Sequence, residues 1–150
     1  MPLEFGSESI VASSPVGNTV TSLTELLHEG ETSTYSVQLT GPGGAAIADT
    51  QFSAITLIYL DEETRSIINT RGDQDVLNLN DHTLSATALL TWLIQAEDTV
   101  MVDPTNTRQI EYHRAVYKYE FDIGSGPEIA FHEVRFPVRA AFSAGGVSFT

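Results

Sequence analysis

Histidines and acidic residues are the side chains of this sequence that could bind a metal ion or transfer protons. His113 and His132 stand on two alternating segments that we expect to pair, with both rings on the inward face. Two such rings could hold a metal ion together with a carboxylate. Inward histidines are more often hydrogen-bonded members of a core. Neither has a short ligand spacing to His28 or His82, so we predict no metal site.

A polar stretch around residues 70–81 carries two further motifs. Its Asp and Asn residues offer the oxygen ligands that Ca²⁺ prefers, but the positions that require an oxygen ligand and a glycine hold Leu77 and Asn78. Arg71-Gly72-Asp73 matches a cell-adhesion tripeptide, a match short enough to arise by chance. We expect a solvated turn in both cases.

Catalytic patterns are not found. Gly41-Pro42-Gly43-Gly44 lacks the lysine and hydroxyl residue of a phosphate-binding loop, and no serine lies in a nucleophile-elbow pattern. Adjacent carboxylates such as Glu62 and Glu63 point to opposite faces of a strand and cannot share a substrate. With no cysteine, thiol catalysis, disulfides and cysteine–zinc sites are excluded. We therefore expect no enzyme and no cofactor.

The composition is strongly acidic. Seven basic residues against twenty acidic ones give a formal net charge of −13. Such a field repels phosphate backbones and anionic lipid surfaces, so we expect neither nucleic acid nor membrane as a partner. No apolar run is long enough to span a bilayer, and no secretory signal is expected. A chain of 150 residues corresponds to one domain.

Alternation of apolar and polar residues predicts several strands. Residues 32–39 place Tyr35, Val37 and Leu39 on one face. Two longer alternating runs, 111–122 and 130–140, flank a Gly-Ser-Gly-Pro turn and predict a long hairpin. Pro137 cannot donate a backbone hydrogen bond, so we expect an edge or a bulge beside it.

Two apolar segments complete the predicted sheets. Residues 52–60 are apolar on both faces, which is typical of a central strand covered on each side. Residues 89–95 fit a helix or a strand; their short length favours a strand with Trp92 in the core, followed by a helical turn at 96–99. The spacing of the turns predicts an all-β fold, most simply an immunoglobulin-like β-sandwich over residues 19–142, with one or two short helical turns.

The two ends of the sequence are candidate attachment segments. Residues 1–18 are rich in Ser, Gly and Pro with spaced apolar side chains, which indicates either a frayed terminus or an extended arm that docks on a neighbouring subunit. Residues 143–150 form a tail that could add a strand to a neighbour's sheet edge or pair within its own domain. The candidate partner-binding residues are Leu3, Phe5, Ile10, Val11, Val147 and Phe149.

The central and C-terminal part contains a set of short segments whose order and spacing are informative. The set comprises Leu57–Asp61, Ile67–Asn69, Gln74–Asn78, Leu90–Trp92, Glu97–Thr99 and His132–Arg139. In this order it resembles virion proteins of tailed bacteriophages and is similar to the immunoglobulin-like N-terminal domains of phage baseplate proteins, over about residues 32–140. The glycine-containing turn expected before Leu90–Trp92 is here Ser85–Ala88, and residues 1–18 match nothing in that family. The resemblance implies a structural role without catalytic residues.

Three functions are compatible with these features. Small size, the arm and the acidic charge favour a head decoration or cement protein that stabilises the capsid by binding major capsid subunits. The resemblance to baseplate domains favours a tail, neck or baseplate adaptor. In both cases the protein would be part of the virion, assembled in the host cytoplasm, within a homo-oligomer or symmetric assembly. The third is a carbohydrate-binding module, based on Trp92, Tyr112, Tyr117 and Tyr119, of which only Tyr112 is expected outward.

Overall fold

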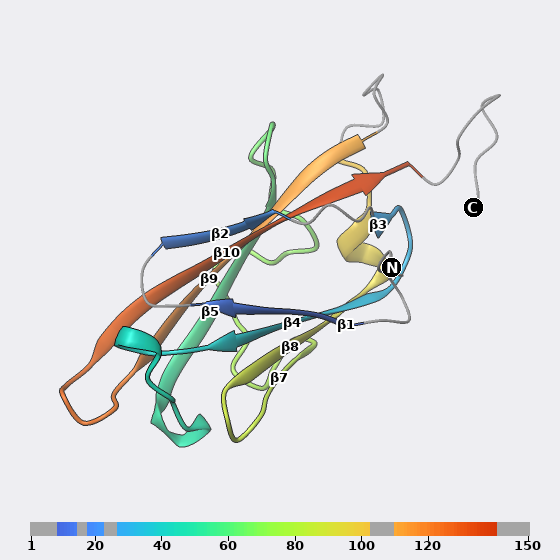
Figure 1. The fold of residues 1–150 in the computed structure, drawn as a ribbon. Coiled ribbons are helices and arrows are strands. Elements are labelled where there is room, and N and C mark those ends of the chain that lie inside the picture. The colour runs from blue at the N-terminus through green and yellow to red at the C-terminus, as the bar shows by residue number, and fades with distance from the viewer. Residues whose placement is uncertain (1–8, 15–17, 23–26, 103–109, 141–150) are drawn as a thin grey trace, which may run out of the picture.

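In the computed structural model, this protein folds into two β-sheets that pack face to face (Figure 1). The structure describes residues 9–14, 18–22, 27–102 and 110–140, with side chains from Leu27 onward. Strands β1 (Ser9–Ser14), β4 (Ser33–Leu39), β8 (Leu89–Ile94) and β7 (His82–Leu84) form the smaller sheet in that order. The larger sheet runs β2 (Asn18–Ser22), β10 (Glu128–Arg139), β9 (Ile110–Phe121), β5 (Phe52–Asp61) and β6 (Gln74–Asp75), and β3 (Leu27–His28) also pairs with β10. The predicted all-β sandwich is confirmed.

The predicted hairpin is the longest element of the fold. Strands β9 and β10 pair in antiparallel register from Ile110 with Arg139 to Phe121 with Glu128. Gly124 and Gly126 have φ values of 111° and 106° in the connecting turn, a region that favours glycine. The Asp122 carboxylate accepts hydrogen bonds from both of their backbone N–H groups, at 2.8 and 3.2 Å. Glycine and aspartate together therefore specify this turn.

Aromatic rings fill the space between the sheets. Trp92 on β8 is 0% exposed, as expected, and meets Tyr59 of β5 edge to face at 5.0 Å between ring centroids. Phe136 of β10 makes edge contacts with both rings. Contacts of this geometry add roughly 0.5–1.5 kcal/mol each beyond the area they bury. The strand alternation thus brings one aromatic cluster together from both sheets.

Strand β5 differs from its prediction. Its buried side chains alternate, with Ile55, Leu57 and Tyr59 inward, while Ile58 is 37% exposed on the other face. β5 pairs with β9 along its length but with β6 only at Thr56 and Leu57, so it lies next to the edge of its sheet. The prediction of a strand covered on both faces is wrong, because only the inner face of β5 is covered and the apolar side chain of Ile58 stays exposed on the outer face.

Pro137 lies within β10, opposite Tyr112 of β9. On one side, β10 pairs with β9 throughout. On its other side, it pairs with β2 from Phe131 to Arg135 and with β3 at Val138 and Arg139. The residues between these two parallel partners, 23–26, lie outside the described ranges. The register with β9 runs through Pro137 without a bulge, and the edge or bulge expected on the other side stays a prediction.

Helical structure in the described ranges is limited to three short 3-10 turns, η1 (Pro42–Gly44), η2 (Asp49–Gln51) and η3 (Ala96–Thr99). The last of these confirms the predicted helical turn at 96–99. Within the same ranges, no helix has the length and apolar character needed to cross a membrane.

Candidate functional site

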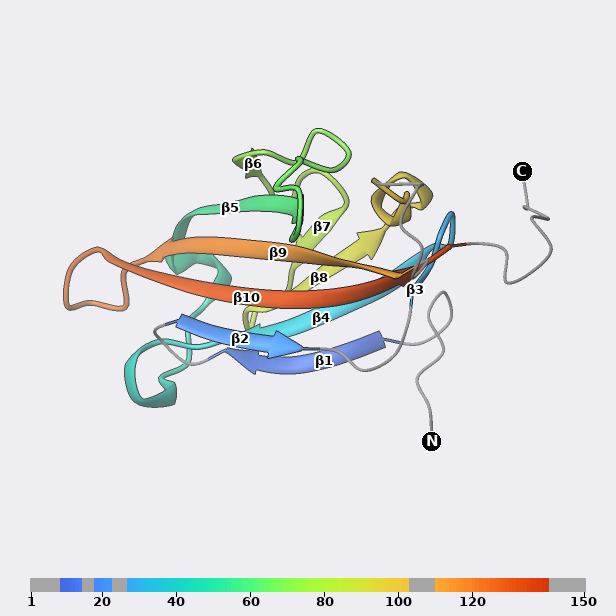
Figure 2. The same cartoon turned by 90° about the horizontal axis from the view of Figure 1, so that it is seen from above.

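The N-terminal residues add a strand to each sheet. β1 pairs in parallel with β4, from Ser9 opposite Thr34 to Ser14 opposite Leu39. β2 pairs in parallel with β10, from Asn18 opposite Phe131 to Ser22 opposite Arg135. Figure 2 shows both strands along the same flank of the sandwich, each at the edge of a different sheet. The backbone of this segment therefore covers the edges of both β4 and β10 on that flank.

The predicted partner-binding residues fall in two groups. Ile10 and Val11 belong to β1 and stand opposite Tyr35 and Ser36 of β4. Leu3, Phe5, Val147 and Phe149 lie outside the described residues. Ile10 and Val11 are thus part of a strand that pairs within the same chain.

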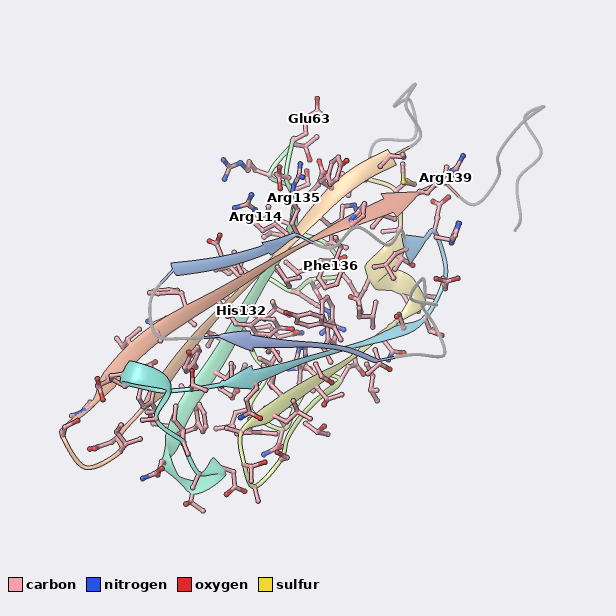
Figure 3. All side chains as sticks on the ribbon, in the orientation of Figure 1. Glu63, Arg114, His132, Arg135, Phe136 and Arg139 are labelled. Carbon is pink, nitrogen blue, oxygen red and sulfur yellow. The ribbon has the colours of Figure 1, made fainter. Side chains whose placement is uncertain are left out.

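A charged cluster lies on the outer face of the larger sheet (Figure 3). Glu62 accepts hydrogen bonds from Arg114 at 3.1 Å and Arg135 at 2.9 Å, and Arg114 also pairs with Glu133 at 3.2 Å. Burial acts to raise the pKa of Glu62, but the hydrogen bonds from the two arginines outweigh it and hold that pKa below its usual value. Because these side chains are about 30% exposed, each pair contributes only about 1 kcal/mol or less.

Tyr112 is the outward aromatic residue that the sequence predicts, with 38% of its surface exposed. The guanidinium of Arg135 lies over its ring at 3.7 Å. Trp92, Tyr117 and Tyr119 are each 0% exposed, as expected of core residues. These four aromatic residues therefore do not form the flat exposed platform that a carbohydrate-binding module would use.

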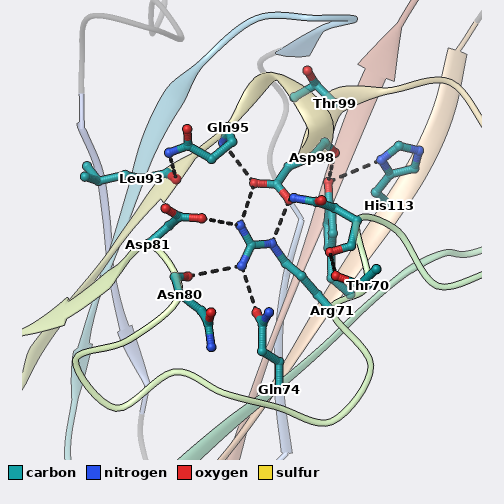
Figure 4. A network of polar contacts seen from close by, with 12 residues as sticks. Thr70, Arg71, Gln74, Asn80, Asp81, Leu93, Gln95, Asp98, Thr99 and His113 are labelled. Atoms are coloured by element: carbon teal, nitrogen blue, oxygen red, sulfur yellow. Dashed lines mark hydrogen bonds and ion pairs between the residues drawn. The ribbon is translucent and has the colours of Figure 1, made fainter.

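Arg71, itself buried, is the centre of a polar network that joins the loop after β5 to the 3-10 turn η3 (Figure 4). Its Nε and Nη2 donate to the Asp98 carboxylate at 2.6 and 3.1 Å, and Nη2 also donates to Asp81 at 2.7 Å. Nη1 donates to the Gln74 side chain and to the Asn80 carbonyl oxygen. All five N–H groups of the guanidinium are thus used. Burial opposes the charge, but the bonds to Asp98 and Asp81 raise the pKa of Arg71.

The loop that carries Arg71 has an unusual backbone. Asn69, Asp73, Asn78 and Asn80 have φ between 52° and 57°, which Asn and Asp tolerate. Thr70 has φ of 56°, a real outlier for a β-branched residue. Backbone strain of this kind persists where surrounding contacts hold it. The Arg71 network provides those contacts.

The two motifs of this polar stretch have structural roles. Arg71 is 2% exposed, so the Arg-Gly-Asp tripeptide does not present its arginine to an adhesion receptor. The oxygens of the predicted turn cluster are used within the loop: Asp75 accepts from the Leu77 N–H, and Asn78 from the Leu84 N–H. The prediction of a solvated turn agrees with the exposed positions of this stretch, such as Asp73 and Asn78, and is wrong for Arg71, which is buried.

His82 and His132 are hydrogen-bonded core residues. His132 Nε2 lies 2.6 Å from the Tyr35 hydroxyl, and His82 Nε2 lies 2.7 Å from the Tyr117 hydroxyl. Burial lowers the pKa of each ring to about 4. His132 pairs with Tyr117 and His113 with Phe136 across the hairpin, so the two inward histidines do not meet. The core interpretation of His113 and His132 is confirmed, and His82 is buried in addition.

The third inward histidine has acidic neighbours. Asp61 ends β5 and stands opposite His113 of β9 in the strand register, and Glu111 lies two residues before His113 on the same face. All three are buried, and one ligand atom from each lies within 4.8 Å of the others. His113 Nε2 lies 2.9 Å from Glu111 Oε1. The Glu-x-His spacing on a strand was the signal visible in the sequence. The position of Asp61 beside these two residues follows only from the strand register.

A pocket of about 210 Å³ opens beside this cluster. Asp61 and Glu111 line it together with Glu62, Glu63, Ile110, Tyr112 and Arg135. Its volume is below the roughly 300–1,000 Å³ of typical small-molecule sites. The pocket suits an ion or a single side chain.

No protein-family model and no curated protein matches this sequence. Among solved structures, the chain is similar to the N-terminal domain of phage TP901-1 ORF48, with a TM-score of 0.41 and 9% sequence identity. The similarity covers 86% of this chain and 98% of that one. At this identity no residue role passes from one chain to the other.

Proposed function

We propose that this protein is a structural component of a tailed-bacteriophage virion, which acts by binding other virion proteins and not by catalysis. The observation that carries the binding role is the position of β1 and β2, which add one strand to each sheet through parallel backbone pairing. Strand addition needs little sequence specificity and joins protein chains in many assemblies. A segment that pairs in this way within one chain can make the same contacts with a neighbouring copy.

The phage assignment rests on the segments that resemble virion proteins. The positions of these segments in the fold show which residues the resemblance concerns. Leu57, Tyr59, Trp92, Phe136 and Val138 from these segments are all 0% exposed. At these five positions the resemblance concerns core residues of the sandwich, whereas the proposed attachment strands lie outside the resembling segments.

Two positions in the particle are supported by different features. The acidic charge of −13 and the small size favour a head decoration protein bound to major capsid subunits. The likeness to baseplate N-terminal domains favours a tail, neck or baseplate adaptor. In either position the partners are other virion proteins, and β1 and β2 are the attachment strands of this proposal.

Quantitative mass spectrometry of purified particles tests the proposal and separates the two positions. A head decoration protein is expected at a copy number close to that of the major capsid protein, and an adaptor at about a dozen copies. Immunogold labelling of the same particles should mark heads in the first case and tails in the second. Absence of the protein from purified particles would contradict both.

A further inference from the structure

We propose that Asp61, Glu111 and His113 bind a divalent transition-metal ion, with Zn²⁺ as the probe, at the end of the sandwich where β5 ends and β9 begins. The three residues are 2%, 5% and 0% exposed. One imidazole and two carboxylates form a mixed nitrogen and oxygen set that suits Zn²⁺ or Mn²⁺ better than Ca²⁺ or Mg²⁺. The site is independent of the position of the protein in the particle.

Hydrogen bonding determines which nitrogen of His113 carries the proton. The Tyr59 hydroxyl donates to the Asp98 carbonyl oxygen at 2.8 Å, and a carbonyl oxygen can only accept. The hydroxyl has no second proton for His113 Nδ1, which lies 3.2 Å away. The ring must therefore donate from Nδ1 to the Tyr59 oxygen. In the neutral ring this leaves the lone pair on Nε2.

That lone pair faces an acceptor. His113 Nε2 lies 2.9 Å from Glu111 Oε1, and neither atom has a proton to share when the ring is neutral and the glutamate ionised. A cation between them converts this repulsion into two ligand bonds. Ligand atoms about 2.0–2.2 Å from one ion lie roughly 3.0–3.5 Å apart, so small side-chain shifts suffice to admit it.

The contacts around the cluster orient all three ligands. Thr64 donates from its backbone N–H at 2.9 Å and its hydroxyl at 2.7 Å to Asp61 Oδ2. The Val102 N–H donates to Glu111 Oε1 at 2.7 Å. Tyr59 accepts from the second nitrogen of His113, as the outer partners of metal-bound histidines commonly do. The cluster thus has the supporting contacts of a built metal site.

The adjacent pocket provides a route to the site. Asp61 and Glu111 line it together with Glu63, whereas the charge of Glu62 at the same wall is paired with that of Arg135. Three protein ligands leave a fourth position of a tetrahedral ion for water or for a side chain from outside. A partner could therefore complete the coordination.

Glu111→Gln is the decisive variant because it distinguishes a metal ion bound between Glu111 and His113 from an extra proton on His113. Glu111 Oε1 both accepts from the Val102 N–H and faces His113 Nε2, so the amide either keeps an oxygen for Val102 or turns its N–H toward the lone pair on Nε2; in both orientations the negative charge is lost. If a metal ion bridges the two residues, this variant folds stably without metal and no longer responds to it. If instead an extra proton makes His113 cationic, the variant loses an ion pair and is destabilised.

The experiment uses tag-free, EDTA-treated protein titrated with Zn²⁺ and, for its spectrum, Co²⁺. Wild-type protein is expected to bind one equivalent, to show the visible absorption bands of coordinated Co²⁺, and to gain at least about 4 °C in Tm at a hundredfold excess over Kd. Glu111→Gln and His113→Asn should each weaken binding at least about 10–100-fold. Far-UV circular dichroism verifies the fold of each variant.

Glu120→Gln is the matched control, since it makes the same chemical change on strand β9 at a residue that does not line the pocket. It should keep the stoichiometry, the Co²⁺ spectrum and the Tm gain of the wild type. Loss of binding in this control equal to that in Glu111→Gln would overturn the proposal, as would a wild type that binds no Zn²⁺ or Co²⁺ beyond the level of Glu111→Gln.

Discussion

Arg71 and Asp98 face each other in the interior through two hydrogen bonds, of 2.6 and 3.1 Å, although Arg71 belongs to a loop that is otherwise largely polar. Asn69 and the Gln95 backbone N–H donate to the same carboxylate. The ion pair therefore fixes the strained loop around Thr70 to η3, and Arg71 Cζ lies 5.5 Å from the centre of the Trp92 ring. It joins the least regular part of the chain to its core.

Removal of one partner of this pair is expected to be costly. Asp98→Asn leaves the buried guanidinium without its main counter-charge, and we expect a loss of about 3–5 kcal/mol in the free energy of unfolding. Urea melts measure it. Glu62→Gln is the control, since it breaks part-exposed pairs and should cost about 1 kcal/mol or less. Equal losses in the two variants would contradict the anchoring role of Asp98.

Trp92 separates the effect of volume from that of a hydrogen bond. Its Nε1 has no hydrogen-bond partner among the described residues, so the loss of this N–H breaks none there. Trp92→Ala should cost roughly 3–5 kcal/mol through the cavity, and Trp92→Phe only about 1–2 kcal/mol. Denaturant melts measure both. A change within error for Trp92→Ala would mean that the residue is not in the core.

The two core histidines predict a pH dependence of stability. Their pKa values are about 4 in the folded protein and near 6.5 when unfolded, so the unfolded chain takes up protons first as the pH falls. Their contribution is complete above about pH 6.5 and is lost between pH 6.5 and 4, on the order of 3 kcal/mol per histidine. Urea melts across this pH range should show that the free energy of unfolding depends less steeply on pH in His132→Gln than in the wild type. A dependence on pH in His132→Gln as steep as that of the wild type would contradict this origin.

Deletion of residues 1–18 tests the attachment strands. It removes all of β1 and the first residue of β2, while the aromatic core from Tyr35 onward stays complete. We expect a folded domain with an open β4 edge that is no longer incorporated into particles, measured by circular dichroism and by mass spectrometry of purified virions. A deletion variant that fails to fold would show that β1 is part of the core.

Period-two alternation predicted the hairpin and the β4 strand, because one buried face leaves a clear mark in the sequence. For β8, the short length of the apolar segment decided between a helix and a strand and placed Trp92 in the core. The prediction of a fully covered β5 failed for the opposite reason, because Ile58 on its outer face is apolar but exposed. The Arg71 network was hidden because a lone arginine in a polar loop gives no sign of burial. The Asp61 and His113 neighbourhood depends on strand register, which residue spacing along one strand does not specify.

The pairing of the strands also sets a direction for the molecule. β1 begins opposite Thr34, β3 precedes β4 by a few residues, and β3 pairs with the last residues of β10. The start of β1 and the end of β10 therefore lie at one end of the sandwich. The β9–β10 turn with its two glycines lies at the opposite end. A protein attached through both of these ends has one defined orientation relative to its partner. Insertions or fusions at the 122–127 turn would then project away from whatever holds the protein.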